Sequence, residues 1–162
     1  MEDDAIELLT RLPNGRILVT MAPEKAATGT IAKLAKRGVL VCAGHTAGTY
    51  NDIQAAISEG LRGFTHLFNA MSPMSHREPG VAGAAMADDS TWCGLIADGY
   101  HVHPAVLKIA IHAKATGKIM LVTDAMPTVG AANKRFVLGG EEITATDGRC
   151  ALADGTLAGS DL

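Results

Sequence analysis

Aromatic residues and an excess of positive charge are both lacking in this 162-residue sequence. Phe, Trp and Tyr make up 4% of the residues, so stacking platforms for bases or sugars are few. Lys and Arg number 14 against 17 Asp and Glu, and a net charge of −3 does not suit a nucleic-acid backbone or an anionic membrane surface. No apolar run reaches the roughly 18 residues of a membrane span. We therefore expect a soluble globular protein that binds neither nucleic acid nor membrane.

Cysteine is sparse as well, and its placement excludes two roles. Cys42, Cys93 and Cys150 are odd in number, far apart and without Cys-x-x-Cys spacing, so we expect no disulfide framework and treat them as small buried apolar residues. Residues 1–4 are acidic where an export signal would be positive. The sequence predicts a cytoplasmic protein with reduced thiols.

Glycine is abundant, and it separates short apolar runs instead of forming a low-complexity tract. The apolar runs predict strands at 16–21, 39–43, 63–68, 91–97 and 118–123. Helical spacing predicts helices around 31–35, at 50–59 with Thr49 and Asp52 as an N-terminal cap, and from Pro104 to about 117. The segment at 72–80 is polar and contains proline, which indicates an exposed loop.

This alternation of strands and helices predicts a parallel sheet covered on both faces, either doubly wound or closed as a barrel. The pattern changes at Arg135, after which short alternating segments and Gly-Gly or Asp-Gly pairs predict β-hairpins. We therefore expect a β/α part at 1–134 and a separate hairpin segment at 135–162.

Polar side chains collect directly after the predicted strands. They are Glu24, His45, His66, Asn69, Asp98, His101 and Asp124. In parallel α/β folds the carboxyl ends of the strands share one side, where active sites lie, so these residues are expected to converge. A single histidine at such a place is more often a packing residue, but two on successive strands with an aspartate on a later one favour a metal site.

The chemistry of this group leaves one ligand position open. His45 and His66 could ligate a divalent metal, and Asp124 could hold or deprotonate a water molecule activated by it. A third protein ligand is lacking; Glu24 qualifies by position, but capping of the following helix is at least as good an explanation. Arg77 and His101 form a second set that could bind an anion such as phosphate, although Arg77 alone suits a solvated loop.

Seven short strings carry a resemblance to a known family. They are Met21-Ala22-Pro23-Glu24, Ala43-Gly44-His45-Thr46, Thr65-His66-Leu67-Phe68-Asn69-Ala70-Met71, Arg77-Glu78-Pro79-Gly80, Asp98-Gly99-Tyr100-His101, Leu121-Val122-Thr123-Asp124-Ala125 and Gly155-Thr156-Leu157-Ala158-Gly159-Ser160. In order and spacing the sequence resembles the N-acetylglucosamine-6-phosphate deacetylase family of the amidohydrolase superfamily, from about residue 17 onward.

The resemblance implies a metal-dependent deacetylase on a (β/α)8 barrel with a small flanking β-domain. By the family's pattern His45 and His66 bind the metal and Asp124 accepts and donates the proton. The matching substrate-binding residues are Asn69, Ala70, Arg77, Asp98, His101, Leu157, Ala158 and Gly159. Zinc is the expected metal, with iron, cobalt and manganese also able to accept imidazole. The implied substrate is an amino-sugar phosphate, and the implied assembly is a homodimer or larger.

The sequence departs from the family in extent. It supplies five of the eight strand–helix units of a barrel, and the family's glutamate ligand, carried in a His-x-Glu-Gly-Pro segment, does not occur in it. We therefore expect an internal fragment of about barrel strands four to eight, inactive on its own. The alternatives are a non-catalytic phosphate-binding or oligomerisation module derived from such a barrel, and an amidohydrolase acting on another substrate.

Overall fold

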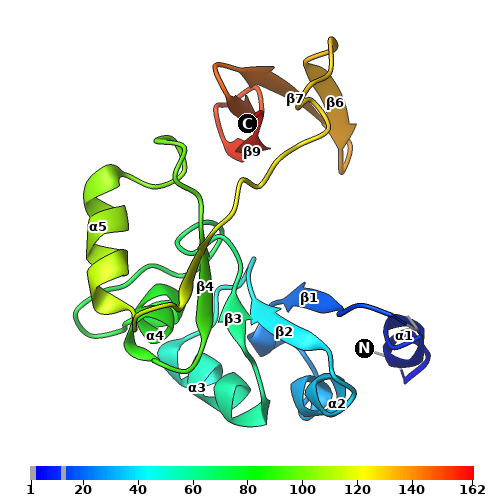
Figure 1. Ribbon diagram of the computed structural model, residues 1–162, viewed down its shortest axis with the longest axis vertical. Helices are drawn as coiled ribbons and strands as arrows, with labels where there is room; N and C mark the ends of the chain where they lie inside the picture. Colours follow the sequence, from blue (N-terminus) through cyan, green and yellow to red (C-terminus); the bar gives the residue numbers. More distant parts are fainter. Residues whose placement is uncertain (1–2, 12–13) are drawn as a thin grey trace. The chain divides into compact units, whose positions relative to one another are not determined.

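A parallel sheet forms where the strand–helix alternation predicts one. The computed structural model describes residues 3–11 and 14–162, and the sheet has the strand order β1-β2-β3-β4-β5 (Figure 1). Its strands are β1 Leu18–Met21, β2 Leu40–Ala43, β3 Gly63–Phe64, β4 Trp92–Leu95 and β5 Ile119–Leu121. The β1/β2, β2/β3 and β3/β4 pairs are parallel. All five lie within the predicted ranges, each shorter than predicted.

In the described part of the chain, six helical segments accompany the strands. They are α1 Asp3–Leu9, the 3-10 helix η1 Pro23–Lys25, α2 Thr30–Lys36, α3 Tyr50–Glu59, α4 Gly80–Ala87 and α5 Pro104–Ala113. The bounds of α3 agree with the prediction, and Thr49 and Asp52 form the expected capping box, in which each side chain bonds the other's backbone amide.

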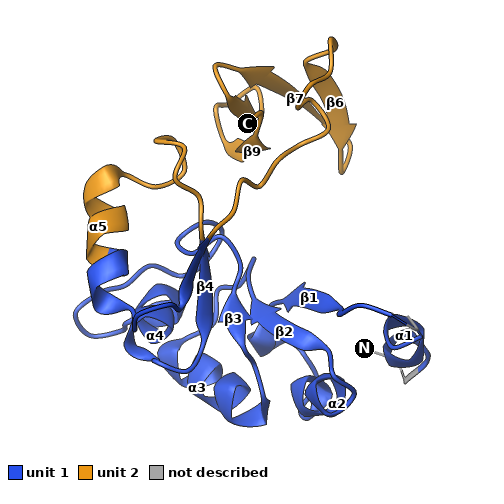
Figure 2. Ribbon diagram, in the orientation of Figure 1, with its two compact units in different colours: residues 1–94, 110–120 blue, residues 95–109, 121–162 orange. Residues whose placement is uncertain are grey.

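The chain divides into two compact units, which we describe separately (Figure 2). Residues 1–94 and 110–120 form the first, and residues 95–109 and 121–162 form the second. In the first unit α2, α3 and α4 lie along the sheet (Figure 1). Its core is apolar: Leu34 of α2, Ile53 of α3 and Val41 of β2 are fully buried. Val41, Cys42 and Ala43 of β2 are all buried, which explains why this strand is a continuous apolar run in the sequence.

Two features of the first unit differ from the sequence prediction. The strand predicted at 63–68 ends at Phe64, because His66 and Phe68 adopt left-handed backbone with φ of 36° and 80°, which extended pairing cannot accommodate. The helix α4 was not predicted. Its residues from Gly80 to Met86 are all buried, so it shows no apolar stripe, and Gly80 and Gly83 are poor helix formers.

Lys114 fixes the segment between α4 and β4. Its ammonium group donates to the carbonyl of Ala85 at 2.7 Å, to the carbonyl of Asp88 and to the Thr91 hydroxyl at 3.1 Å, and the residue is 5% exposed. Replacing it by methionine retains the apolar stem but leaves these acceptors without a donor. We expect Lys114→Met to lower the free energy of unfolding by about 2–3 kcal/mol, measured by urea denaturation. Lys118→Met, whose bond to the Ser90 carbonyl is exposed, serves as control and should change it far less.

The second unit carries the predicted hairpins. Its antiparallel sheet has the order β6-β7-β8-β9, with β6 Arg135–Leu138, β7 Glu141–Thr146, β8 Arg149–Ala151 and β9 Leu157–Ser160. Gly139-Gly140 and Asp147-Gly148 lie at the first two turns, as predicted. Ile143, Ala145 and Cys150 form its small core.

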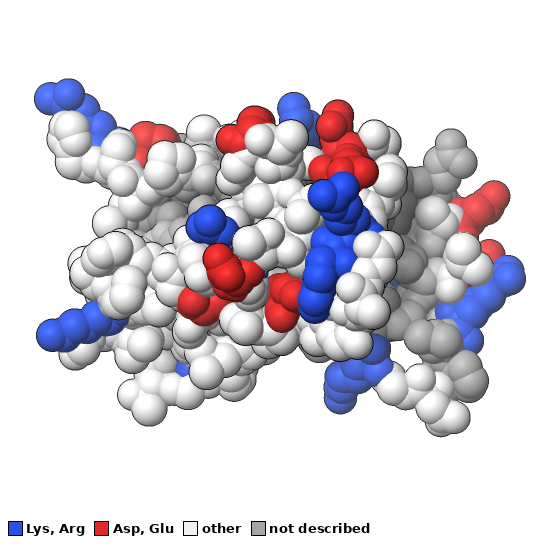
Figure 3. Space-filling view, turned by 90° about the horizontal axis from the view of Figure 1, so that it is seen from above, with Lys and Arg blue, Asp and Glu red and all other residues white. Residues whose placement is uncertain are grey.

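Charged side chains of both signs are mixed on the surface (Figure 3), as the near-balanced composition predicts. Figure 3 shows basic and acidic side chains interspersed on the face viewed. Within residues 3–11 and 14–162 no helix has the length and apolar character to cross a membrane.

Cys42, Cys93 and Cys150 are free and buried, and burial raises the pKa of Cys42 and of Cys93 to about 11. These two thiols therefore stay protonated and unreactive at neutral pH.

Candidate active site

The two predicted metal ligands lie against each other. His45 and His66 each come two residues after a strand, β2 and β3 respectively. Their Nε2 atoms are 3.1 Å apart and their rings meet edge to face, with centroids separated by 4.9 Å. His66 is 6% exposed, whereas His45 is exposed. The parallel register of β2 and β3 thus brings together two imidazoles that are 21 residues apart in the sequence.

Backbone strain concentrates at the predicted site residues. Among the described residues the non-glycine positions with positive φ are His45, His66, Phe68, Ala70, Asp124 and Asp147. All but Asp147, which lies in a hairpin turn, follow a strand of the parallel sheet. Left-handed backbone costs a side-chain-bearing residue about 1–3 kcal/mol and persists where the surroundings over-determine it, most often at functional sites. His45, His66 and Asp124 share this property.

The residues present fit part of a metal centre. Two nitrogens bound to one tetrahedral zinc lie about 3.3 Å apart, which is close to the observed separation of the two Nε2 atoms. A metal-binding histidine donates the hydrogen of its other ring nitrogen to an acceptor. Nδ1 of His66 is buried without such a partner, so the described residues do not meet this second requirement. No cluster of three or more His, Cys, Asp or Glu suited to a metal occurs in the described part of the chain. The two imidazole nitrogens therefore lie at a separation that one metal ion could bridge, and the described residues supply no third ligand beside them.

Glu24 neither joins the histidines nor caps the next helix. Gly29 is the residue that precedes α2 as its N-cap. The Glu24 carboxylate instead accepts hydrogen bonds from the Thr46 hydroxyl at 2.5 Å and from the amide of Ala47 at 3.0 Å. It therefore connects the loop after β1 to the loop that carries His45.

The loop after β3 holds the predicted sugar-binding residues of the first unit. The Asn69 side-chain amide donates to the carbonyls of His66 and Leu67 at 3.2 and 3.3 Å, and the Ala70 carbonyl accepts from the Thr46 amide at 3.0 Å. Arg77 is exposed farther along this loop, and its guanidinium makes no hydrogen bond or ion pair with the described residues. This charged group remains accessible to an anion.

Asp98 and His101 form a buried pair in the second unit. His101 Nδ1 donates to Asp98 Oδ2 at 2.6 Å, and these side chains are 4% and 2% exposed. Asp98 Oδ1 accepts from the amides of Tyr100 and His101, both at 2.9 Å. Burial opposes ionisation of Asp98, but the hydrogen bonds from the amide and imidazole of His101 and from the Tyr100 amide outweigh it and lower the pKa of this carboxyl. The carboxylate fixes the ring so that Nε2 is the nitrogen that remains for a ligand.

The pH dependence of stability tests this pair. Because the folded-state pKa of Asp98 is lowered, its stabilisation is present above the unfolded value of about 3.9 and is lost as pH falls through the folded value. We expect Asp98→Asn to lower the free energy of unfolding at pH 7 by about 1.5–3 kcal/mol, with the difference from wild type shrinking below about pH 4. Urea denaturation across pH measures it. Asp154→Asn, in an exposed turn, is the control, and an equal effect there would contradict the role of burial.

Asp124 is held by the last strand of the second unit. The Ser160 amide donates to the Asp124 carbonyl at 2.9 Å, and the Met126 amide donates to the Ser160 carbonyl at 2.9 Å. Gly159 of β9 lies so close that a Cβ there would be 2.8 Å from the Asp124 carbonyl oxygen and 2.5 Å from Met126 Cε. Leu157, Ala158 and Gly159, predicted as substrate-binding residues, thus belong to the strand that fixes Asp124.

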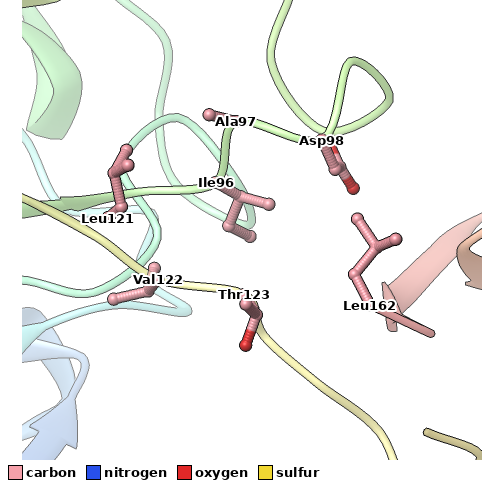
Figure 4. A pocket seen from close by; sticks show the side chains of 7 residues that line it. All are labelled: Ile96, Ala97, Asp98, Leu121, Val122, Thr123 and Leu162. Carbon is pink, nitrogen blue, oxygen red and sulfur yellow. The ribbon is translucent and has the colours of Figure 1, made fainter.

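A pocket of about 220 Å³ opens between the segments that follow β4 and β5 (Figure 4). Its lining residues are Ile96, Ala97, Asp98, Leu121, Val122, Thr123 and Leu162. Asp98 lines this hollow, and so does Thr123, the residue before Asp124. The approach of Asp124 to the two histidines stays a prediction of the parallel topology.

Comparison with known proteins finds relatives in the family that the strings resemble. No protein-family model matches the chain. It is 42% identical over 146 residues to N-acetylgalactosamine-6-phosphate deacetylase of Escherichia coli O157:H7 and 40% identical over 146 residues to N-acetylglucosamine-6-phosphate deacetylase of Bacillus subtilis, covering 90% of this chain in each case. The crystal structure of N-acetylglucosamine-6-phosphate deacetylase from Pasteurella multocida matches all of this chain with a TM-score of 0.92 at 33% identity. The chain is a homologue of the N-acetylglucosamine-6-phosphate deacetylases.

The match to these deacetylases covers a minority of their length. The chain spans 38% of the E. coli relative, 37% of the B. subtilis relative and 42% of the P. multocida chain. The similarity therefore extends over less than half of each of these proteins.

Three residues that hold the loops of the candidate site were missed by the sequence analysis. Thr46 bonds Glu24, Ser160 bonds the Asp124 backbone, and Glu78 accepts from the amides of Tyr50 at 2.8 Å and Gly80 at 2.9 Å beside Arg77. Each lies within one residue of a predicted site residue, or joins the backbone next to one. Their position beside predicted site residues was the signal that the sequence offered. The partners Glu24, Asp124 and Tyr50 are distant in the sequence, so only the folded chain shows these hydrogen bonds.

Proposed function

We propose that this chain is the part of an N-acetylglucosamine-6-phosphate deacetylase that carries two metal ligands, the proton-transfer residue and the sugar-phosphate-binding loops. The observation that carries the proposal is the 3.1 Å approach of His45 Nε2 and His66 Nε2 on neighbouring strand ends, in a homologue of enzymes with that name. The reaction is hydrolysis of the N-acetyl group of N-acetylglucosamine 6-phosphate to glucosamine 6-phosphate and acetate.

Each residue has a defined task in this reaction. His45 and His66 hold a divalent metal, zinc first among zinc, iron, cobalt and manganese, which when bound supplies Lewis-acid activation of the acetyl carbonyl and of water. Asp124 takes a proton from the attacking water and returns it to the amide nitrogen, which must be protonated to leave. Arg77 and His101 Nε2 bind the phosphate. Asn69, Ala70 and Leu157–Gly159 orient the sugar.

The extent of the chain defines its place in the enzyme. We assign its parallel strands to about strands four to eight of a (β/α)8 barrel, with the barrel part at 1–134 and a segment of the flanking β-domain at 135–162. The edge strands support this assignment: Leu18 of β1 is 54% exposed and Leu121 of β5 is 75% exposed, where the remaining barrel units would cover them. The same apolar surface favours association into a homodimer or larger assembly. Its reduced, buried cysteines suit the cytoplasm.

A second substrate has specific support. The E. coli relative, 42% identical, is named for N-acetylgalactosamine 6-phosphate, a sugar that differs in configuration at one hydroxyl-bearing carbon. The roles of His45, His66 and Asp124 would be unchanged. The loops of Asn69 and Leu157–Gly159, which contact the sugar in this proposal, would decide between the two substrates.

A chimeric enzyme tests the function directly. This chain replaces the matching segment of the B. subtilis relative, and release of acetate is measured with N-acetylglucosamine 6-phosphate, N-acetylgalactosamine 6-phosphate and unphosphorylated N-acetylglucosamine. We expect turnover of a phosphorylated sugar that falls strongly in the Arg77→Ala variant through a higher KM. A folded chimera that binds phosphorylated sugar without turnover would favour a non-catalytic module derived from the barrel. The isolated chain is expected to show negligible turnover.

A further inference from the structure

Thr46 joins the loops that follow three consecutive strands. Its amide donates to the Ala70 carbonyl at 3.0 Å, and its carbonyl accepts from the Ser72 amide at 3.2 Å, so it pairs with the loop that also holds His66. Its side chain points to the loop after β1, where the hydroxyl donates to Glu24 Oε2 at 2.5 Å. The residue is 4% exposed. Every polar group of Thr46 is therefore used to fix the backbone next to His45.

Glu24 completes this arrangement from the loop after β1. Its second carboxylate oxygen accepts from the Ala47 amide at 3.0 Å, so the carboxylate holds the two residues that follow His45. The Thr46 hydroxyl also accepts from the Gly48 amide at 3.2 Å. Burial opposes ionisation of Glu24, but the hydrogen bonds from the Thr46 hydroxyl and the Ala47 amide outweigh it and hold the pKa below its ordinary value. At neutral pH the group acts as an acceptor only.

We propose that Glu24 and Thr46 are positioning residues that hold His45 in the left-handed conformation in which its Nε2 faces His66. His45 has φ of 50°, which it would leave unless its neighbours were fixed on both sides. Strand β2 fixes the chain before it, and the Glu24–Thr46 pair fixes the chain after it. The inference rests on the proposed function, because it assigns the pair a purpose only if His45 and His66 bind a metal.

Zinc titration of the full 162-residue chain by calorimetry tests the inference. Four single variants are compared with wild type: Glu24→Gln, Thr46→Val, Thr46→Ser and Ser90→Ala. Thr46→Val removes the donating hydroxyl, and Glu24→Gln leaves one acceptor oxygen for two donors, the Thr46 hydroxyl and the Ala47 amide. Both changes alter the shape little, and each should weaken zinc binding by about tenfold, as loss of outer-shell support does. Thr46→Ser retains the hydroxyl and should stay within about twofold of wild type.

Ser90→Ala is the matched control. It removes a hydroxyl–carboxylate bond of the same kind, 2.8 Å from Ser90 Oγ to Asp88 Oδ1, in an exposed turn that precedes β4 instead of following a strand. Zinc affinity should be unchanged. Thermal unfolding of every variant confirms that titrations are made on folded protein, and Glu24→Gln and Thr46→Ser remain informative if Thr46→Val fails to fold.

A double-mutant cycle separates positioning of His45 from general destabilisation. In a His45→Ala background the ligand that the pair positions is gone, so adding Glu24→Gln should alter zinc affinity less than about twofold. A tenfold loss in that background would overturn the positioning role, as would wild-type affinity in both Glu24→Gln and Thr46→Val. If the wild-type chain binds no zinc, the same variants are titrated in the chimeric enzyme, where the rest of the barrel supplies the further ligands. Absence of zinc binding there would overturn the histidine metal pair of the proposed function, and the inference with it.

Discussion

Replacing Asp124 by asparagine should lower kcat of the chimeric deacetylase on the order of 10³-fold, the size expected when a general acid–base residue is removed. The amide can neither take the proton from water nor return it to the leaving nitrogen. Asparagine tolerates the left-handed φ of 54° that Asp124 adopts, so the fold should be unaffected. Steady-state kinetics with N-acetylglucosamine 6-phosphate, together with equilibrium binding of the sugar, measure both effects.

The matched control for this substitution is Asp147→Asn. Asp147 also has a left-handed φ, 52°, and lies in the same unit, but it is an exposed residue of the β7–β8 turn. Its variant should retain full turnover. Full turnover by Asp124→Asn as well would remove the proton-transfer role, whereas unchanged sugar binding with lost turnover would separate an enzyme from a binding module.

Substituting Gly159 by alanine should lower the free energy of unfolding by about 3–5 kcal/mol, combining overpacking with backbone strain. A Cβ at this position would lie 2.5 Å from Met126 Cε and 2.8 Å from the Asp124 carbonyl oxygen, and φ is 133°, where side chains are disfavoured. The clash with a backbone oxygen cannot be relieved by a rotamer change. Urea denaturation gives the energy, and amide chemical shifts of Met126 and Ser160 report displacement of the segment.

Gly155→Ala measures the backbone part of this effect alone, so the difference between the two variants gives the steric part. Gly155 has a positive φ of 88° in the turn before β9, and a Cβ there would meet nothing within 4 Å. Only the backbone penalty of about 1–2 kcal/mol should remain. Equal losses in the two variants would show that close approach of β9 to the Asp124 segment contributes nothing to stability.

The predictions that succeeded depend on local signals. The apolar runs at 39–43 and 50–59 gave a buried strand and a capped helix because periodicity, glycine stops and the Thr49–Asp52 pair act within a few residues. The Gly-Gly and Asp-Gly pairs gave the hairpin turns for the same reason. The end of β3 at Phe64 was not predictable in this way, because the left-handed backbone of His66 depends on contacts with neighbouring loops.

By itself the sequence determined the strand–helix alternation, the change to hairpins at Arg135, and which residues follow the strands, since each is encoded by side chains close to one another in the chain. Only the tertiary structure decided that His45 and His66 face each other, that Glu24 bonds Thr46, and that β9 holds Asp124. Those contacts join residues separated by 21 or more positions, and strand register and backbone hydrogen bonds between loops set them. A linear pattern carries no information about which polar group will meet which partner once the sheet has formed.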